Sequence, residues 1–112
     1  MQFKVGDSVK VKAKVIDPDF PEQSIANWQG RIVGIEDGDE APLLEIQWDS
    51  VTLKGIPLDH LINVEEEGYD WTSMILYPDD VVAATERDTE EDVEKTWEEL
   101  DERLSEEFDD EE

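Results

Sequence analysis

The sequence predicts a mainly β, α+β protein: a small five-stranded barrel over residues 1–64, followed by an acidic extension over residues 65–112 that ends in a helix. Three observations lead to this fold class. Short runs of alternating apolar and polar residues are separated by turn-forming Gly, Pro and Asp. The apolar residues gather before about residue 77. The last part of the chain instead repeats apolar residues at helical spacing, and 112 residues allow one domain with a modest core.

The first predicted strand, residues 8–16, alternates apolar and basic side chains without a break. That period of two is typical of a half-buried antiparallel strand. A loop with two prolines, 17–22, follows it. The other predicted strands are 30–36, 43–49, 51–53 and 61–64, with a hairpin at 37–42 and a helical turn at 56–60. Five short strands with a helical turn before the last are typical of SH3-like or Tudor-like barrels.

The extension is expected to pack back on the barrel through residues 74–77 and through a C-terminal amphipathic helix. That helix is predicted to begin at Thr89, because Thr89 and Asp92 form a capping-box pattern and acidic residues in a first turn suit the helix dipole. One apolar stripe runs along it, formed by Val93, Trp97, Leu100, Leu104 and Phe108.

Acidic residues dominate the charge of this chain, which carries a formal net charge of −24. Residues 65–112 hold 22 of the 33 acidic residues against three basic ones, a net charge of −19, whereas residues 1–64 carry −5. Such a surplus repels itself, so a metal ion, a basic partner or high salt would stabilise the compact state. The same charge argues against nucleic-acid and membrane-surface partners.

Several classes of protein are not expected. The start of the chain lacks the apolar core of a signal peptide, and no run approaches the ~18 apolar residues that span a membrane, so we expect a cytoplasmic protein. The chain has no cysteine and one histidine, His60, and it lacks a Gly-rich phosphate loop. Carboxylates are so numerous that no pair stands out as a catalytic acid and base. We therefore do not expect an enzyme.

Two acidic segments are the candidate metal site, and the expected ion is Ca²⁺. Asp37, Asp39 and Glu40 surround a glycine in the predicted hairpin, while Glu66, Glu67 and Asp70 follow the last predicted strand. Calcium takes six to eight oxygen ligands in flexible geometry, whereas magnesium prefers an octahedron and keeps its waters. A bound ion would remove the repulsion between these carboxylates and tie the two segments together. The spacing of an EF-hand loop is absent.

Two further acidic groups are weaker candidates. Asp79 and Asp80 follow a proline, and a larger group spans residues 86–92. Helix capping competes with metal binding as the explanation of the larger group.

Five stretches of the chain carry a resemblance: Trp-Gln-Gly-Arg-Ile-Val-Gly-Ile from Trp28, Leu-Glu-Ile-Gln-Trp-Asp-Ser-Val-Thr-Leu from Leu44, Ile-Pro at Ile56, Glu-Glu-Glu-Gly-Tyr-Asp-Trp from Glu65, and Arg-Asp-Thr-Glu-Glu-Asp from Arg87. Over roughly residues 5–95 the chain resembles the cyanobacterial CcbP-like calcium-binding proteins, which are small, very acidic and without EF-hands. The resemblance implies calcium binding and control of free cytosolic calcium, as a buffer or a sensor. The six ligand candidates above are our own choice and are not transferred from that family.

The leading alternative is an acidic interaction module that binds a basic protein or peptide. Small barrels of this kind bind basic, methylated or proline-rich peptides through aromatic cages. Five aromatic residues are candidates for such a cage: Phe20, Trp28, Trp48, Tyr69 and Trp71. The surrounding acids would steer a cationic segment toward them.

Two other interpretations of the acidity stay open. Halophilic adaptation would spread acids over the whole surface, yet the first predicted strand keeps Lys10, Lys12 and Lys14. Mimicry of nucleic acid would use the acidic face of the helix after Thr89, but nothing specifies the spacing of its carboxylates.

Overall fold

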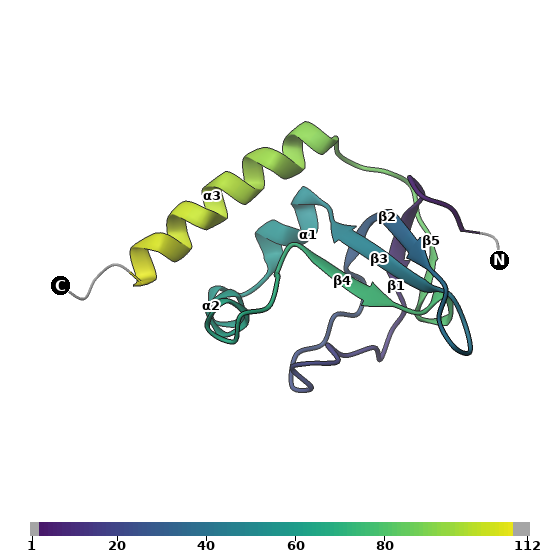
Figure 1. Ribbon diagram of the computed structural model, residues 1–112. Coiled ribbons are helices and arrows are strands. Elements are labelled where there is room, and N and C mark those ends of the chain that lie inside the picture. The colour runs from purple at the N-terminus through teal and green to yellow at the C-terminus, as the bar shows by residue number, and fades with distance from the viewer. Residues whose placement is uncertain (1–2, 109–112) are drawn as a thin grey trace.

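Figure 1 shows the fold in a computed structural model, which describes residues 3–108 of the chain. The elements in chain order are β1 (Ser8–Val11), β2 (Gln29–Glu36), β3 (Leu43–Trp48), α1 (Ser50–Gly55), α2 (Leu58–Glu66), β4 (Ser73–Leu76), the 3₁₀ helix η1 (Pro78–Asp80), β5 (Val81–Ala83) and α3 (Glu90–Phe108). The predicted α+β class, with a five-stranded sheet and a C-terminal helix, is confirmed.

The five strands form one antiparallel sheet in the order β4-β3-β2-β1-β5. Strands β4 and β5 are its two edges and do not pair with each other, so the sheet is open and the predicted closed barrel is not confirmed. Both edge strands come from residues 73–83, within the segment that we expected to be an extension.

Two of the predicted strands are confirmed almost to the residue, as β2 and β3. The first predicted strand ends early, at Val11. Val9 and Val11 are buried as the alternation predicts, but Lys14 adopts a left-handed backbone conformation with φ of 73°, which turns the chain away from the sheet. Because lysine rarely adopts this conformation, the sequence pattern did not predict a turn at this position.

The strands predicted at 51–53 and 61–64 are wrong, because these residues belong to the helices α1 and α2. Asp49 starts α1: its side chain accepts a hydrogen bond from the Thr52 N–H at 2.8 Å, the interaction of a helix N-cap. In α2, Leu61 and Val64 lie on one buried face. Burial of one helical face thus overrode the strand propensity of the β-branched residues in both segments. The predicted helical turn at 56–60 is the start of α2.

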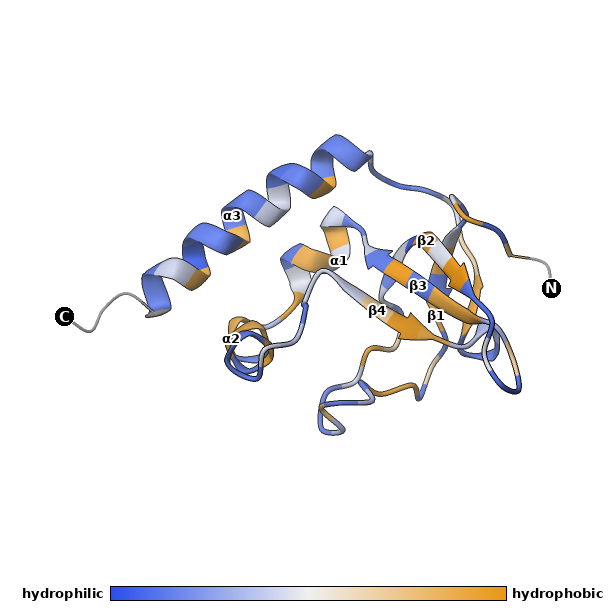
Figure 2. Cartoon of the chain, viewed as in Figure 1, coloured by the Kyte–Doolittle hydropathy of each residue, from blue (hydrophilic) through white to orange (hydrophobic). Residues whose placement is uncertain are grey.

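The C-terminal helix α3 begins as predicted. Thr89 and Asp92 exchange backbone-to-side-chain hydrogen bonds of 3.1 and 3.2 Å, which is the capping box. Of the predicted stripe, Val93, Leu100 and Leu104 are buried and Trp97 is half-buried, while the side chain of Phe108 lies outside the described residues. The helix packs against α1 and α2, and Figure 2 shows its hydrophobic patches on the side that faces them.

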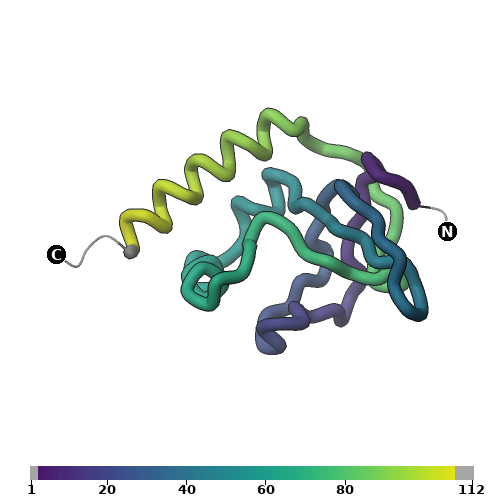
Figure 3. The backbone as a smooth tube through the Cα atoms, in the orientation of Figure 1, coloured from purple at the N-terminus to yellow at the C-terminus, as the bar shows by residue number. Residues whose placement is uncertain are grey.

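The core lies between the sheet, α1, α2 and α3, and Trp48 is its largest fully buried side chain. The segment between β1 and β2 leaves the sheet and loops out on the side away from α3, close to α2 (Figure 3). Ring contacts of Phe20 with His60 and with Tyr69 join this loop to α2 and to the turn that follows it. No helix within residues 3–108 is long and apolar enough to cross a membrane.

Candidate functional site

A cavity of about 300 Å³ lies where four segments meet: the loop at 17–20, α2, the turn at 69–71 and the edge strand β4. This cavity is lined by all five aromatic residues that we predicted as candidates for a cage: Phe20, Trp28, Trp48, Tyr69 and Trp71. They come from distant parts of the chain, and only the fold brings them together. We call this cavity the aromatic pocket.

The aromatic rings lie edge to face. Phe20 contacts His60 and Tyr69 with ring centroids 5.3 and 5.9 Å apart, and Trp28 contacts Trp48 at 5.2 Å. Trp48 is 1% exposed and belongs to the core, whereas Tyr69 is 51% exposed. The pocket therefore has a buried floor and a solvent-exposed wall.

One buried carboxylate shapes the loop that carries Phe20. Asp17 Oδ1 accepts hydrogen bonds from the N–H groups of Asp19 and Phe20 at 2.8 and 3.3 Å, an Asx turn. Asp17 Oδ2 lies 3.5 Å from His60 Nε2, and both side chains are buried. The pair links the loop to α2 and fixes the distance between the two sides of the pocket.

Carboxylates also line the aromatic pocket. Four acidic residues line it: Asp17, Asp19, Glu45 and Asp70. Asp19, Glu45 and Asp70 are exposed, and Asp70 Oδ1 accepts hydrogen bonds from the backbone and the hydroxyl of Thr72. Among the described residues that line the pocket there is no Lys or Arg. Aromatic faces and carboxylates both attract cations, so the site is suited to a positively charged group.

The six predicted calcium ligands are all exposed and fall into separate places. Asp37, Asp39 and Glu40 lie in the hairpin between β2 and β3, whereas Glu66 and Glu67 lie at the end of α2. These two places are at opposite ends of β3 (Figure 1), a strand of six residues that spans roughly 20 Å. One ion therefore does not contact both. Asp70, the sixth candidate, lines the aromatic pocket.

The hairpin instead approaches η1. Glu40 lines an open surface hollow together with Asp79 and Asp80, the acidic pair that the sequence singled out separately. Asp80 is engaged locally, because its Oδ2 accepts a hydrogen bond from the Tyr77 N–H at 3.2 Å. Within residues 3–108, no group of three or more His, Asp or Glu side chains converges closely enough to hold a metal ion. The described carboxylates thus do not form a ready-made calcium site.

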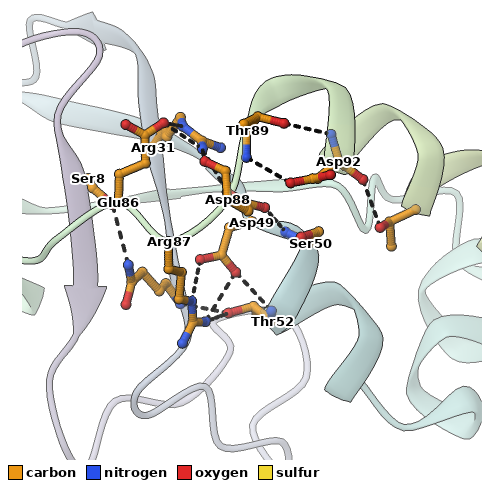
Figure 4. Close-up of polar contacts among 12 residues, drawn as sticks. Ser8, Arg31, Asp49, Ser50, Thr52, Glu86, Arg87, Asp88, Thr89 and Asp92 are labelled. Atoms are coloured by element: carbon orange, nitrogen blue, oxygen red, sulfur yellow. Dashed lines mark hydrogen bonds and ion pairs between the residues drawn. The ribbon is translucent and has the colours of Figure 1, made fainter.

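A second acidic region, on another part of the molecule, is fully paired. Arg31 of β2 binds two acidic residues of the segment before α3, and Arg87 of that segment binds the acidic residue that caps α1 (Figure 4). We call this network the arginine clamp, and its members are Arg31, Asp49, Ser50, Thr52, Glu86, Arg87 and Asp88.

Arg31 and Asp88 form the centre of the arginine clamp. Arg31 Nη2 lies 2.6 Å from Asp88 Oδ1 and 2.8 Å from Glu86 Oε2, and it also donates to the Asp88 carbonyl. The other carboxylate oxygen of Asp88 accepts a hydrogen bond of 2.6 Å from the Ser50 N–H. The Asp88 side chain is only 4% exposed, so these contacts replace its hydration.

Arg87 forms the second half of the clamp. Its Nε donates to Asp49 Oδ2 at 2.7 Å and its Nη2 donates to the Thr52 hydroxyl at 2.9 Å. Asp49 therefore has two roles, because it caps α1 and also binds Arg87 of the segment that leads into α3. For the acidic group at 86–92, the sequence allowed either helix capping or metal binding. In the structure, Glu86 and Asp88 pair with arginine, and Asp92 takes part in the cap of α3.

The clamp shifts the pKa values of its members. Burial raises the pKa of Asp88, but hydrogen bonds from Ser50 and Arg31 and the charge of Arg31 outweigh burial, so its pKa lies below 3.8. Burial lowers the pKa of Arg31, but the hydrogen bonds and charges of Glu86 and Asp88 outweigh burial and raise it above its ordinary value. Both shifts favour the charged pair.

Sequence reasoning found the aromatic residues but missed His60, Asp17 and Glu45 as parts of the same site. Asp17 carried one usable signal, since an Asp followed by Pro is a common turn start. No sequence pattern indicated that Glu45 and His60 belong to the site. The position of Glu45 depends on the pairing of β3 with β4, and that of His60 depends on α2 being a helix.

Comparisons of the chain with protein-family models, curated proteins and solved structures find no match. The function is therefore inferred from the residues of the site alone.

Proposed function

We propose that this protein is an interaction module that binds a cationic side chain of a basic protein or peptide in the aromatic pocket. The observation that carries the proposal is the meeting of five aromatic residues and four carboxylates around one cavity of about 300 Å³, with no Lys or Arg among the described residues that line it. We also propose that the open sheet is a variant of the SH3-like or Tudor-like barrel. A 3₁₀ helix, η1, precedes its last strand, β5, although η1 is a different segment from the helical turn predicted at 56–60.

The physical basis is the attraction of a cation to aromatic faces and to carboxylates. A cation over a Trp or Tyr face gains about 0.5–1 kcal/mol when exposed and about 2 kcal/mol or more when desolvated. The net charge of −24 would speed the encounter with a basic partner, especially at low salt. Alkylated ammonium and guanidinium groups suit the pocket best, because they are weakly hydrated and cover aromatic faces well.

The test is an NMR titration with a minimal probe, acetyl-trimethyllysine methylamide. We expect saturable shifts of the Trp28, Tyr69 and Trp71 signals. The control ligand replaces the trimethylammonium group by the neutral tert-butyl group of the same shape. If both ligands bind equally, the pocket recognises shape and not charge, and the proposal is wrong.

A matched pair of variants locates the binding. Tyr69→Ala removes an exposed wall of the pocket, and Tyr77→Ala removes an equally exposed tyrosine outside it, since the two are 51% and 52% exposed. Loss of one aromatic face should weaken binding about three- to fivefold in Tyr69→Ala and leave Tyr77→Ala unchanged. Equal effects would show that the probe binds the surface at large.

Calcium binding is a second candidate function, and one observation favours it. The hairpin and η1 place Glu40, Asp79 and Asp80 around one hollow, and carboxylates are the ligands that calcium prefers. The test is calorimetric titration of chelator-stripped protein with calcium, at about 0.15 M salt and with millimolar magnesium present. Stoichiometric binding that Asp79→Asn weakens and Glu66→Gln leaves unchanged would support it. Heat that magnesium abolishes would argue for a diffuse ion cloud.

A further inference from the structure

We infer that the basic partner binds as an extended strand along the free edge of β4, which places one of its cationic side chains in the aromatic pocket. The inference rests on the proposed function and adds to it the conformation and the side-chain pattern of the partner.

The edge of β4 has backbone groups available for another strand. Ser73–Leu76 is the last strand of the sheet and pairs only with β3. The Trp48 N–H donates to the Thr72 carbonyl, and hydrogen bonding alternates along an antiparallel pair. The backbone groups of Met74 therefore face β3, and those of Ser73 and Ile75 face away. Among residues 3–108, no other element hydrogen-bonds to the backbone of Ser73 or Ile75.

The same edge is a wall of the aromatic pocket. Ser73, Met74 and Ile75 line the cavity, and the loop at 17–20 lines it too. Unpaired strand edges are templates for extended peptides, and an aligned pocket then selects among side chains. The pocket and the free edge thus form one continuous surface.

The strand register assigns side chains of the partner to the two faces of the sheet. Met74 and Trp48 lie on one face, because Met74 pairs with Ile46 and alternate residues share a face. Glu45 and Ile75 lie directly opposite each other on the other face. A partner residue opposite Met74 therefore points toward Trp48 in the pocket, and its two neighbours in sequence point toward the side of Glu45.

Charge complementarity defines what those residues are. The central one is cationic because Asp17, Asp19 and Asp70 line the pocket that it enters. A neighbour on the other face meets Glu45 and the exposed Ile75, so a lysine or arginine with its long apolar stem fits there. The predicted recognition pattern is an extended run of consecutive basic residues whose central member fills the pocket.

The experiment uses the full chain and a seven-residue peptide with a central trimethyllysine, a lysine on each side of it and threonine beyond. Amide hydrogen exchange is measured with and without the peptide. We expect exchange of the Ser73 and Ile75 amides to slow about tenfold or more at saturation. The Met74 amide, which already faces β3, is the internal control and should not change.

A second peptide pair tests the backbone contacts from the other side. Methylating the peptide nitrogens that face β4 should weaken binding about tenfold, because it removes hydrogen-bond donors. Methylating the alternate nitrogens should have a smaller effect. Binding that shifts Trp28 and Tyr69 but protects neither edge amide would overturn the strand inference and leave the pocket intact. Failure of both the peptide and acetyl-trimethyllysine methylamide to bind would overturn the proposed function itself.

Discussion

The aromatic pocket and the arginine clamp are both acidic, yet their carboxylates have opposite surroundings. In the clamp, Asp49 and Asp88 are buried and each is hydrogen-bonded to an arginine. At the pocket, Asp19, Glu45 and Asp70 are exposed, and the described residues that line it include no Lys or Arg. A negative net charge alone therefore does not identify a cation-binding site. The informative carboxylates are those that the fold leaves unpaired next to a surface that favours a cation.

The two regions also differ in what they join. The clamp ties β2 and α1 to the segment that leads into α3, so it holds the helix in place (Figure 4). The pocket lies among the loop at 17–20, α2 and β4, and several of its lining residues are exposed. Substitutions in the clamp should therefore change stability, and substitutions at the exposed rim of the pocket should change binding.

The largest effect is expected when the clamp loses its central cation. Arg31→Met leaves the Asp88 carboxylate, only 4% exposed, without its charged partner. Removing one member of a buried ion pair costs about 3–5 kcal/mol of unfolding free energy. Urea denaturation measures this loss. Arg103→Met, at an exposed position of α3, is the control, because it changes the net charge equally. A loss below about 1 kcal/mol in Arg31→Met, as for a surface pair, would contradict the structural role of the clamp.

A smaller effect is expected from the nearly isosteric change Asp88→Asn, and it depends on pH. The pKa of Asp88 is lowered in the folded protein, so between the folded and the ordinary pKa the unfolded state binds more protons, and the charged form stabilises the fold. This contribution is fully present above about pH 5 and is lost as the pH falls through the folded pKa. Replacing the charged hydrogen bonds should cost about 1.5–3 kcal/mol at neutral pH.

Unfolding free energies of the wild type and Asp88→Asn, measured by urea denaturation from pH 7 to pH 3, test this sign. The two curves should converge as the pH falls, because protonation removes the same charge from the wild type. A constant difference across the range would show that Asp88 contributes through shape and not through its charge.

The fold was predictable where local patterns and long-range packing agree. The alternation in β2 and β3 and the stripe of α3 correspond to real buried faces, so those elements were found. The errors at 51–53 and 61–64 arose because β-branched residues favour strands locally while the Asp49 cap and the burial of Leu61 impose helices. The strands β4 and β5 were missed because each is at most four residues long, and their identity depends on pairing with β3 and β1.

The candidate site was predictable only as a set of residue types. Aromatic residues near acids indicated a cage, but nothing in the sequence shows that Phe20 contacts Tyr69 or that Glu45 lies beside β4. The sequence likewise does not show that Arg31 pairs with Asp88, which lies 57 positions away. Contacts between distant segments depend on topology, and topology decides which acids are paired.

The smallest expected effect concerns a single rim charge of the aromatic pocket. Asp19→Asn removes one of the four carboxylates that line the pocket, while the turn made by Asp17 keeps its own side-chain hydrogen bonds. Because Asp19 is exposed and screened, binding of acetyl-trimethyllysine methylamide should weaken only about two- to threefold at 0.05 M salt and less at 0.2 M. Asp37→Asn, in the hairpin at the far end of β3, makes the same change of net charge away from the pocket. NMR titrations of both variants separate a local carboxylate from the general field. Equal weakening by the two would mean that the chain attracts cations through its total charge, and that the unpaired acids of the pocket have no special part in recognition.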